Sequence, residues 1–528
     1  MNKTLTKIVL AIVIFCVSAG AYYYPVHKKG YPIYGDYLNL VEARNYAASG
    51  TYMTEDANGA YLSSQNAKLR GVVTGIPNPL TPIIYGRIFK YFGFNINLPS
   101  YVSIVLFSLF NALLFLLISR LFSVKVGFIA GISSALTPVM VVGAVVAGFY
   151  EWAMLFFIGA LWLFLGSKNG PFKAGFVRIF FASILFALSA LARNAFAVSF
   201  IPFFLYDFYL SRSVKRGLLF LLPFLVIFGS TLTPYSWLGV PNGYGSTNPP
   251  FNEAGHLFRD PYSYHFEKDA YIASNFPQGA YTNRYGTQFL EKYGYPTNLK
   301  SQIGAYFESA KIYVTNFFPI INIGGPLVLA LIFYGAWLLR KKNPQLLALF
   351  CLWPVIWFLL LVSRQTGNWD HYIELIFPIV TLSSLGLFEL FKMIKNALGP
   401  KVGRCVATGL FLLFILHLGQ ADKWRLFDDY RSSINALVIN FVNSPDFKNI
   451  KGPIAVYIHQ NVAFTLNYYS DREVVYFDSQ TVEENLKAGK LKNIFAIYGI
   501  KAAFGYSSDL SSQIKSTLKI PVFPYDKK

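Results

Sequence analysis

Long apolar runs separated by short basic connections dominate this chain. A helix needs about 20 apolar residues to cross the hydrocarbon core of a bilayer. Runs of about this length predict membrane spans at residues 5–24, 99–119, 126–148, 151–167, 217–236, 317–339, 345–363, 372–391 and 404–420. The first run also resembles a signal peptide, because it has a basic start, an apolar centre and small residues behind it. The pattern predicts an all-α, multi-pass membrane domain over residues 1–420.

Lysine and arginine collect in every second connection, where acidic residues are almost absent. By the positive-inside rule, these connections are cytoplasmic, and so is the N-terminus. The residues concerned are Lys3, Lys7, Arg120, Lys125, Lys168, Lys173, Arg178, Arg212, Lys215, Arg216, Arg340, Lys341, Lys342, Lys392, Lys395, Lys401 and Arg404. The net charge of +20 therefore reflects topology and not a nucleic-acid partner. The long segments 25–98 and 237–315 are expected on the outer face.

The stretch 176–210 is about two short spans long, and both of its flanks are basic. It must therefore cross an even number of times, as two helices meeting near Arg193 and Asn194. A single tilted helix would break the alternation of charge in every later connection. With this hairpin the chain has about eleven spans, in the inner (plasma) membrane.

The tail, residues 421–528, is expected outside the membrane as a small α/β domain. Two short apolar runs, 454–458 and 474–477, predict buried strands, and 494–498 is expected to be a third. Helical stretches are expected near 461–469 and 482–490. Strands that alternate with helices are typical of a compact α/β unit.

Charged residues make up 14% of the chain and are nearly missing from the centres of the spans. Transporters usually carry ionisable groups at the midplane, so this absence argues against a transporter. Charged and polar groups gather instead at the predicted outer boundary: Asp36, Glu42, Glu151, Arg193, Arg364, Asp370, His371 and Glu374. A site there suits a substrate with one aqueous half and one lipid half.

Several motifs occur in a characteristic order along residues 1–392. An acid, Asp36, follows the first span; a segment with Ala43-Arg44-Asn45 comes next; then Pro77-Asn78-Pro79-Leu80-Thr81-Pro82 leads into a stretch ending Phe92-Gly93. Glu151 opens the fourth span, Arg193 follows Ala190-Leu191-Ala192, and His371-Tyr372 precedes Pro378. This order resembles the GT-C membrane glycosyltransferases, with bacterial relatives of protein O-mannosyltransferases and the lipid A aminoarabinose transferase as the nearest kin.

The resemblance implies transfer of a hexosyl or pentosyl group from a polyprenyl-phosphate donor to a glycan, lipid or protein acceptor of the cell envelope. The carrier phosphate leaves as a stable anion, so no general acid is required. The acceptor needs a base, and a carboxylate can supply one. Asp36 is the expected base in an inverting displacement. Its alternative role is a helix N-cap.

The other site residues also have expected roles in the reaction, and Glu151 and Arg193 each have a purely structural alternative. Glu151 would orient the acceptor or assist a divalent cation, or it would only stabilise a helix N-terminus. Arg193 would bind the donor phosphate through its planar fork of donors, or it would only extend to the membrane surface. Arg364, His371 and Tyr372 would add to the phosphate site; relatives often carry arginine or lysine where His371 stands.

No zinc-ligand spacing occurs in the tail, and no metal ligands are predicted. Two other functions fit parts of the pattern. An envelope oligosaccharide polymerase or ligase also has many spans and a large external loop, but it relies on basic residues there. A lipid-linked oligosaccharide flippase would need a polar cavity reaching the midplane. The early external acid favours the transferase.

Overall fold

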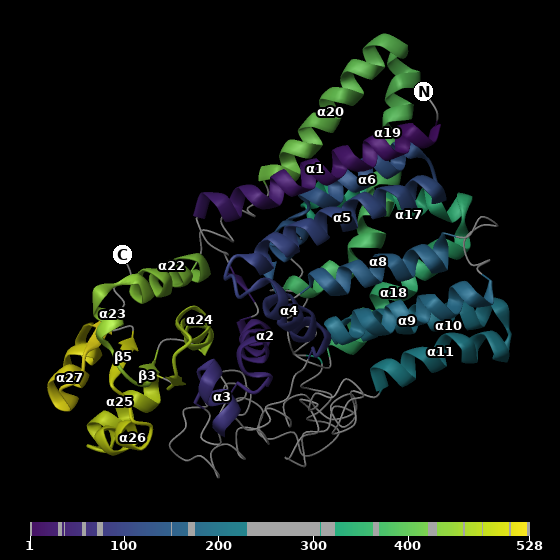
Figure 1. The fold of residues 1–528 in the computed structure, drawn as a ribbon. Coiled ribbons are helices and arrows are strands. Elements are labelled where there is room, and N and C mark those ends of the chain that lie inside the picture. Colours follow the sequence, from purple (N-terminus) through teal and green to yellow (C-terminus); the bar gives the residue numbers. More distant parts are fainter. Residues whose placement is uncertain are drawn as a thin grey trace. The chain divides into compact units, whose positions relative to one another are not determined.

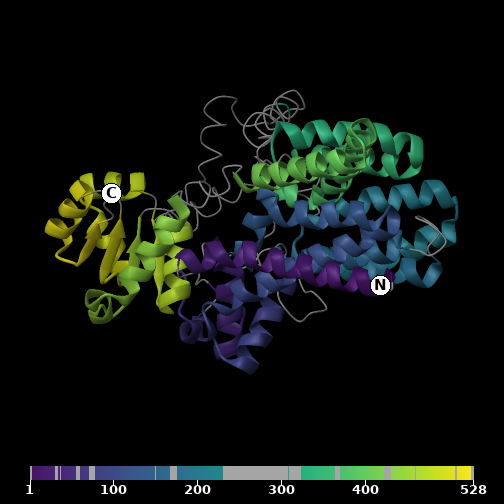
Figure 2. The same cartoon turned by 90° about the horizontal axis from the view of Figure 1, so that it is seen from above.

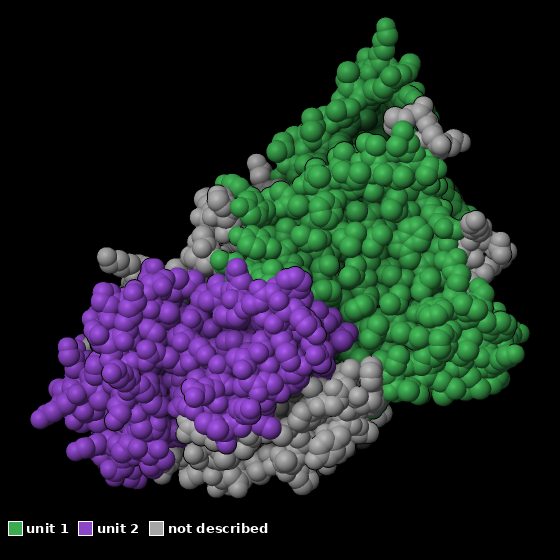
Figure 3. Space-filling view, in the orientation of Figure 1, with its two compact units in different colours: residues 1–35, 97–231, 306–429 green, residues 36–96, 232–305, 430–528 purple. Residues whose placement is uncertain are grey.

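The computed structural model describes fourteen ranges of the 528-residue chain: 3–29, 34–35, 37–54, 60–70, 78–148, 150–166, 175–229, 307, 323–362, 369–420, 430–457, 460–477, 479–505 and 508–524. The described chain is mostly helical (Figure 1). It divides into two compact units, coloured in Figure 3. Unit 1 comprises residues 1–35, 97–231 and 306–429, and unit 2 comprises 36–96, 232–305 and 430–528.

Unit 1 is a bundle of apolar helices. They are α1 (Lys3–Lys29), α5 (Leu98–Leu121), α6 (Val124–Leu136), α7 (Pro138–Val145), α8 (Glu151–Leu165), α9 (Phe176–Ala192), α10 (Phe196–Ser211), α11 (Val214–Gly229), α17 (Pro326–Lys342), α18 (Pro344–Val362), α19 (Ile376–Leu398) and α20 (Pro400–Gln420). Helix α1 runs along α5 and α6 in both Figure 1 and Figure 2, and these three helices are in contact. Helices α17 and α19 approach closely at Gly335, where any Cβ would collide with the Leu382 carbonyl oxygen.

Several of these helices are long and apolar enough to cross a membrane. Within the described ranges these are residues 4–25, 98–121, 372–398 and 400–418, and α6 with α7 would make a fifth span. Helices α8, α9, α10 and most of α18 are apolar but shorter. The count of about eleven spans stays a prediction.

The predicted span 126–148 consists of two helices, because the chain breaks at Thr137. Helices α6 and α7 are bent by 57° relative to each other. Pro138 lacks an N–H for the helical ladder and disfavours helical backbone in the residue before it. Thr137 accordingly has an extended backbone (φ −67°, ψ 132°), and its hydroxyl donates to the Ser133 carbonyl oxygen at 2.6 Å.

The stretch 176–210 forms two helices, as the charge pattern predicts. Helix α9 ends at Ala192 and α10 begins at Phe196. The backbone N–H of Phe196 donates to the Arg193 carbonyl oxygen at 3.0 Å, which closes the turn between them. Its position at the outer face of a membrane stays a prediction.

Unit 2 contains a four-stranded parallel sheet with strand order β4-β3-β5-β6. The strands are β3 (Ile454–Val456), β4 (Val474–Tyr476), β5 (Ala502–Gly505) and β6 (Val522–Pro524). The helices around them are α22 (Tyr430–Asn443), α23 (Pro445–Asn449), α24 (Gln460–Ser470), α25 (Ser479–Lys487), α26 (Leu491–Ile497) and α27 (Ser508–Leu518). The strands predicted at 454–458 and 474–477 and the two helices after them are therefore confirmed as elements.

Successive side chains of a strand point to opposite faces of a sheet, and this sheet buries side chains on both faces. Ile454, Val456 and Phe504 face a core that includes residues of α22, α23 and α24. Ala455, Val475 and Ala503 face a second core that includes residues of α25, α26 and α27. This segment is thus a three-layer α/β arrangement. The division of the chain into 1–420 and 421–528 stays a prediction, because residues 36–96 share this unit with 430–528.

The third strand predicted at 494–498 is wrong. Residues 491–497 form α26, and Leu491, Ile494 and Phe495 are buried with the spacing of one helix face. The third strand is β5, whose sequence is Ala-Ala-Phe-Gly. Alanine and glycine have low strand propensity, so β5 lacks the usual signal.

The other described residues of unit 2 come from the first predicted external segment. It contributes α2 (Tyr37–Ser49), α3 (Ser64–Arg70) and α4 (Leu80–Phe92). Tyr61 extends the sheet edge by exchanging two backbone hydrogen bonds with Val474, at 2.8 and 3.0 Å. Helix α2 packs against α24 as well as against α4.

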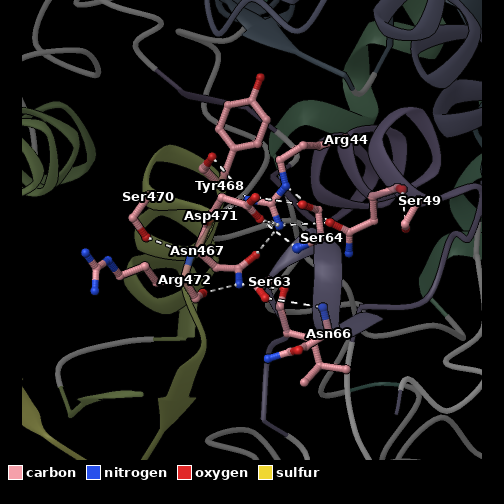
Figure 4. A network of polar contacts seen from close by, with 12 residues as sticks. Arg44, Ser49, Ser63, Ser64, Asn66, Asn467, Tyr468, Ser470, Asp471 and Arg472 are labelled. Carbon is pink, nitrogen blue, oxygen red and sulfur yellow. Dashed lines mark hydrogen bonds and ion pairs between the residues drawn. The ribbon is translucent and has the colours of Figure 1, made fainter. Parts of the chain in front are cut away.

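A buried arginine joins α2 to the C-terminal segment. The Arg44 side chain donates to the backbone carbonyl oxygens of Asn467 (2.5 Å) and Tyr468 (3.3 Å) and forms an ion pair with Asp471 at 3.2 Å (Figure 4). Burial lowers the pKa of Arg44, and the charge of Asp471 opposes that shift. Because burial of a charge is costly unless it is paired, this contact depends on all of its partners.

The partners of Arg44 are themselves held by further contacts. Asp471 accepts the backbone N–H and the hydroxyl of Ser64 at 2.7 and 2.6 Å. The Asn467 amide donates to the carbonyl oxygens of Leu62 and Arg472 at 3.0 and 2.7 Å. The polar network in Figure 4 therefore fixes the start of α3 and the end of α24 together.

Replacement of Arg44 should destabilise unit 2. We expect Arg44→Met to lower the free energy of unfolding by about 2–4 kcal/mol, because buried carbonyl oxygens lose their donors while the half-exposed Asp471 keeps water. Thermal unfolding of the purified protein measures this loss. Lys68→Met, on the exposed side of α3, is the matched control and should change little. Equal stability of the two variants would contradict the assignment.

Candidate active site

Two short parallel strands organise the candidate site in unit 1. Strand β1 (Tyr34–Gly35) pairs with β2 (Val146–Ala147), with Tyr34 opposite Val146 and Gly35 opposite Ala147. Strand β2 directly follows α7 and leads into the turn before α8. The carboxyl ends of parallel strands meet at the same edge.

Glu151 is the first residue of α8 and is fully buried. The backbone N–H of Gly148 donates to its Oε1 atom at 2.9 Å. Gly148 has φ +82°, a left-handed conformation that glycine adopts without strain. The positive end of the helix dipole also favours a carboxylate at this position. The sequence placed Glu151 at this helix start, and the structure adds its burial and the turn that supports it.

Arg193 lies next to the same turn. Its guanidinium carbon is 5.3 Å from the centre of the Tyr150 ring, a cation–π distance, and Tyr150 directly precedes Glu151. Arg193 is half-buried, and its backbone N–H ends α9 by donating to the Ser189 carbonyl oxygen at 2.9 Å. Because α8 and α9 pack side by side, the start of one and the end of the other bring Arg193 to the Tyr150–Glu151 turn.

A third predicted residue, Tyr372, belongs to a short 3₁₀ helix, η3 (Trp369–Leu375), which contacts α7. Its ring is buried, and the centres of the Tyr372 and Trp357 rings are 5.2 Å apart. Tyr372 thus packs as part of the core formed with α18. This contact provides a structural role for Tyr372, and its role at the donor phosphate stays a prediction.

Glu374, also on η3, is a second fully buried acid of unit 1. The Ser199 hydroxyl donates to its Oε2 atom at 3.4 Å and accepts from the Trp353 indole N–H at 3.1 Å. Glu374 was recognised in the sequence only as one of several outer charges. The signal that singles it out is a lone carboxylate between the apolar pairs Tyr372-Ile373 and Leu375-Ile376, which predicts a buried charge.

The remaining site predictions lie outside the described residues. Asp36 and Arg364 are not in the described ranges, and the side chain of His371 is not described either. Within the described ranges, no cluster of three or more His, Cys, Asp or Glu side chains is placed to hold a metal ion. The structure thus brings Glu151 and Arg193 to one turn, while the roles predicted for all of these residues stay predictions.

The fold is similar to that of solved membrane enzymes. The archaeal oligosaccharyltransferase AglB from Archaeoglobus fulgidus, in complex with an inhibitory peptide and a dolichol-phosphate, matches with a TM-score of 0.56 and 11% identity over 94% of this chain and 69% of that chain. An oligosaccharyltransferase of the same organism, tethered with an acceptor peptide, matches with a TM-score of 0.54 and 13% identity over the same shares. ArnT from Cupriavidus metallidurans, bound to undecaprenyl phosphate, matches with a TM-score of 0.48 and 12% identity over 98% of this chain and 89% of that chain.

Comparison of the sequence alone finds no relative: no protein-family model and no curated protein matches it. At identities this low, likeness to AglB establishes the fold and not the activity. The chain has the fold of the GT-C membrane glycosyltransferases and is a multi-pass membrane protein. The fold implied by the motif order is thereby confirmed.

The turn before Glu151 should depend on Gly148. We expect Gly148→Ala to lower the free energy of unfolding by about 1–2 kcal/mol, because its left-handed backbone is strained for any residue with a Cβ. Thermal unfolding measures the loss. Gly175→Ala is the matched control, since Gly175 has an extended backbone (φ −67°) and open space around it. A loss at Gly175 as large as that at Gly148 would contradict the explanation.

Proposed function

We propose that the protein transfers a sugar, as a hexosyl or pentosyl group, from a polyprenyl-phosphate donor to an acceptor of the cell envelope. The reaction takes place at the outer face of the inner (plasma) membrane, with the N-terminus in the cytoplasm and residues 421–528 outside. The acceptor is a glycan, a lipid or a protein.

The fold supports the class of donor. AglB, whose solved structure contains a dolichol-phosphate and a peptide, shares its fold with 94% of this chain. Dolichol-phosphate is a polyprenyl-type lipid phosphate, so this fold accommodates such a carrier in at least that protein. The apolar helices of unit 1 give the present chain a surface that suits the same class of lipid.

The observation that carries the proposal is the pairing of β1 with β2. Asp36 follows Gly35, the last residue of β1, by one peptide bond. The Tyr150–Glu151 turn, with Arg193 beside it, follows β2. An acid that follows one strand in the sequence, a buried acid after its parallel partner and an arginine support the assignment of a base, a group that orients the acceptor and a phosphate-binding cation.

The proposed reaction uses these charges in separate roles. The Asp36 carboxylate takes the proton from the acceptor O–H or N–H as that atom bonds to the anomeric carbon. The bond from the anomeric carbon to the phosphate oxygen breaks, and its electron pair stays on the phosphate. Attack from the opposite face inverts the anomeric centre. Arg193 binds the phosphate anion through its planar guanidinium, which matches phosphate oxygens.

Four further residues have proposed supporting roles. Glu151, held by Gly148, orients the acceptor or a divalent cation beside it. Arg364 and His371 contribute positive charge near the donor phosphate, and His371 does so only when protonated. Tyr372, whose ring packs against Trp357, adds to the same phosphate site.

Two substitutions of Asp36 distinguish a catalytic base from a helix cap. We expect Asp36→Asn to leave expression and folding unchanged and to lower transfer by roughly 10²-fold, since the base is lost. Asp36→Ser keeps a capping side chain at the start of α2 and should be equally inactive. Both variants are expressed in a strain that lacks the protein, and mass spectrometry of envelope glycans measures recovery of the one sugar that the strain loses.

Asp509→Asn is the matched control for this series, because Asp509 is an exposed acid in the first turn of α27. It should restore the sugar fully. Restoration by Asp36→Ser would identify Asp36 as a cap and overturn its assignment as the base.

Substitution of Arg193 should change how the initial rate depends on donor concentration. We expect Arg193→Ala to raise the donor concentration needed for half-maximal rate by roughly tenfold or more, because a charge-assisted bond to phosphate is lost. Arg193→Lys keeps the charge but not the planar fork of donors, so this variant should need a donor concentration between those of the wild type and Arg193→Ala. Initial rates in nanodiscs, with the polyprenyl-phosphate sugar that the deletion strain identifies, measure this dependence.

Arg87→Ala is the control for the lost cation–π contact, since Arg87 lies 5.2 Å from the centre of the Tyr46 ring in unit 2. It should leave the donor dependence unchanged. A folded Arg193→Ala protein with normal donor dependence would assign Arg193 to packing on Tyr150 alone.

A further inference from the structure

A cavity of about 590 Å³ lies in unit 1 among α1, α6, α19 and α20. Its lining includes no described residue of the proposed active site. Helix α19 ends at Leu398, Gly399 turns the chain with φ +77°, and α20 begins at Pro400. The cavity is bordered by the last turns of α19, the first turns of α20 and the start of α6. Its volume is within the range of sites that bind small molecules.

The interior of the cavity is apolar. Leu10, Phe128, Phe388, Phe391 and Phe411 line it. The rings of Phe128 and Phe391 each contact that of Phe411, with 6.5 and 6.3 Å between ring centres. A surface of this kind favours hydrocarbon and offers few hydrogen-bonding partners to a small polar ligand.

The border of the same cavity is strongly basic. Lys125, Lys392, Lys395 and Arg404 contribute to its lining, and among the described residues no acidic side chain does. Lys392 already has a partner, because Glu389 lies 3.2 Å from it and 2.6 Å from Lys342. Lys125, Lys395 and Arg404 are exposed, and none of them forms an ion pair with another described residue.

We propose that this cavity binds an anionic phospholipid of the cytoplasmic leaflet. The headgroup phosphates contact Lys125, Lys395 and Arg404, and an acyl chain lies over the phenylalanines. Charge complementarity selects the occupant: three cations without acidic partners stand at the end of a hydrocarbon-lined cavity, and basic pockets between membrane helices bind such headgroups. The positive-inside rule places these helix ends on the cytoplasmic side. A lipid with two phosphates, such as cardiolipin, matches three cations best.

The test uses the purified full-length protein in detergent, stripped of lipid. Cardiolipin should raise its unfolding temperature in a saturable way, because a ligand that binds only the folded state stabilises it. The variant Lys125→Gln/Lys395→Gln/Arg404→Gln should bind cardiolipin roughly tenfold or more weakly, since each basic residue contributes to headgroup binding. Ala407→Trp keeps all the charges and fills the apolar interior, so it should weaken cardiolipin binding as well.

A matched control removes three exposed cations that do not line the cavity: Lys215→Gln/Arg340→Gln/Lys341→Gln. This control should bind cardiolipin as the wild type does. An equal loss in the control would reduce the effect to general surface charge and overturn the proposal. So would an equal response to phosphatidylcholine, which is neutral overall, or to inorganic phosphate, which has no acyl chain.

The single variant Arg404→Gln keeps the proposal testable if the triple variant fails to fold. It should still weaken cardiolipin binding by a few fold, and native mass spectrometry should then detect fewer bound cardiolipin molecules. An unchanged affinity in folded Arg404→Gln and Ala407→Trp proteins would overturn the site.

Discussion

The guanidinium of Arg44 holds together two segments of unit 2 that lie 423 residues apart in the chain. It is buried, it forms an ion pair with Asp471, and it donates to backbone carbonyl oxygens at the end of α24. A charge removed from water in this way is tolerated only with a full set of partners. The helix α2 is therefore joined to α24, which itself packs against β3 and β4 of the C-terminal sheet.

The candidate active site depends on a different kind of constraint, the way in which short elements end. Strand β2 ends at Ala147, α9 ends at Ala192 and α8 begins at Glu151. Each of these ends is set by a local feature: the left-handed Gly148, or the closed turn at Arg193. Polar side chains are thus positioned at a few helix and strand ends, while the apolar centres of the helices remain free for membrane contact.

Much of the helical architecture could be predicted from the sequence, because apolar runs of span length and basic connections are strong signals. The two helices at 176–192 and 196–211 were predicted from the alternation of charge, the length of the stretch and the polar pair Arg193-Asn194 near its middle. The break at Thr137 was missed, although Pro138 is visible in the sequence, because hydropathy averages over the proline. Strand β5 was missed because its alanines and glycine carry no strand signal, and the periodic apolar residues of α26 were read as a strand in its place.

The site was predicted less completely for a physical reason. Sequence position indicates which acids and cations lie near a predicted boundary, as it did for Glu151 and Arg193. It does not indicate which ring an arginine packs on or which carboxylate is buried: the contact with Tyr150 and the burial of Glu374 both arise from tertiary packing. The Ala43-Arg44-Asn45 motif illustrates the same point, since its arginine binds backbone carbonyl groups within unit 2.

The pairing of β1 with β2 has a consequence for biosynthesis. The two strands are parallel neighbours, yet the chain between them runs from α2 to α7. The entropic cost of closing so long a connection grows only slowly with its length. Its effect is on timing: β1 leaves the ribosome early and keeps an unpaired edge until residue 147 has been made. By then the segments of α5 and α6 have already been synthesised. The strand pair is thus a late event in maturation, and a nascent chain arrested before residue 146 carries a first strand that has nothing to pair with.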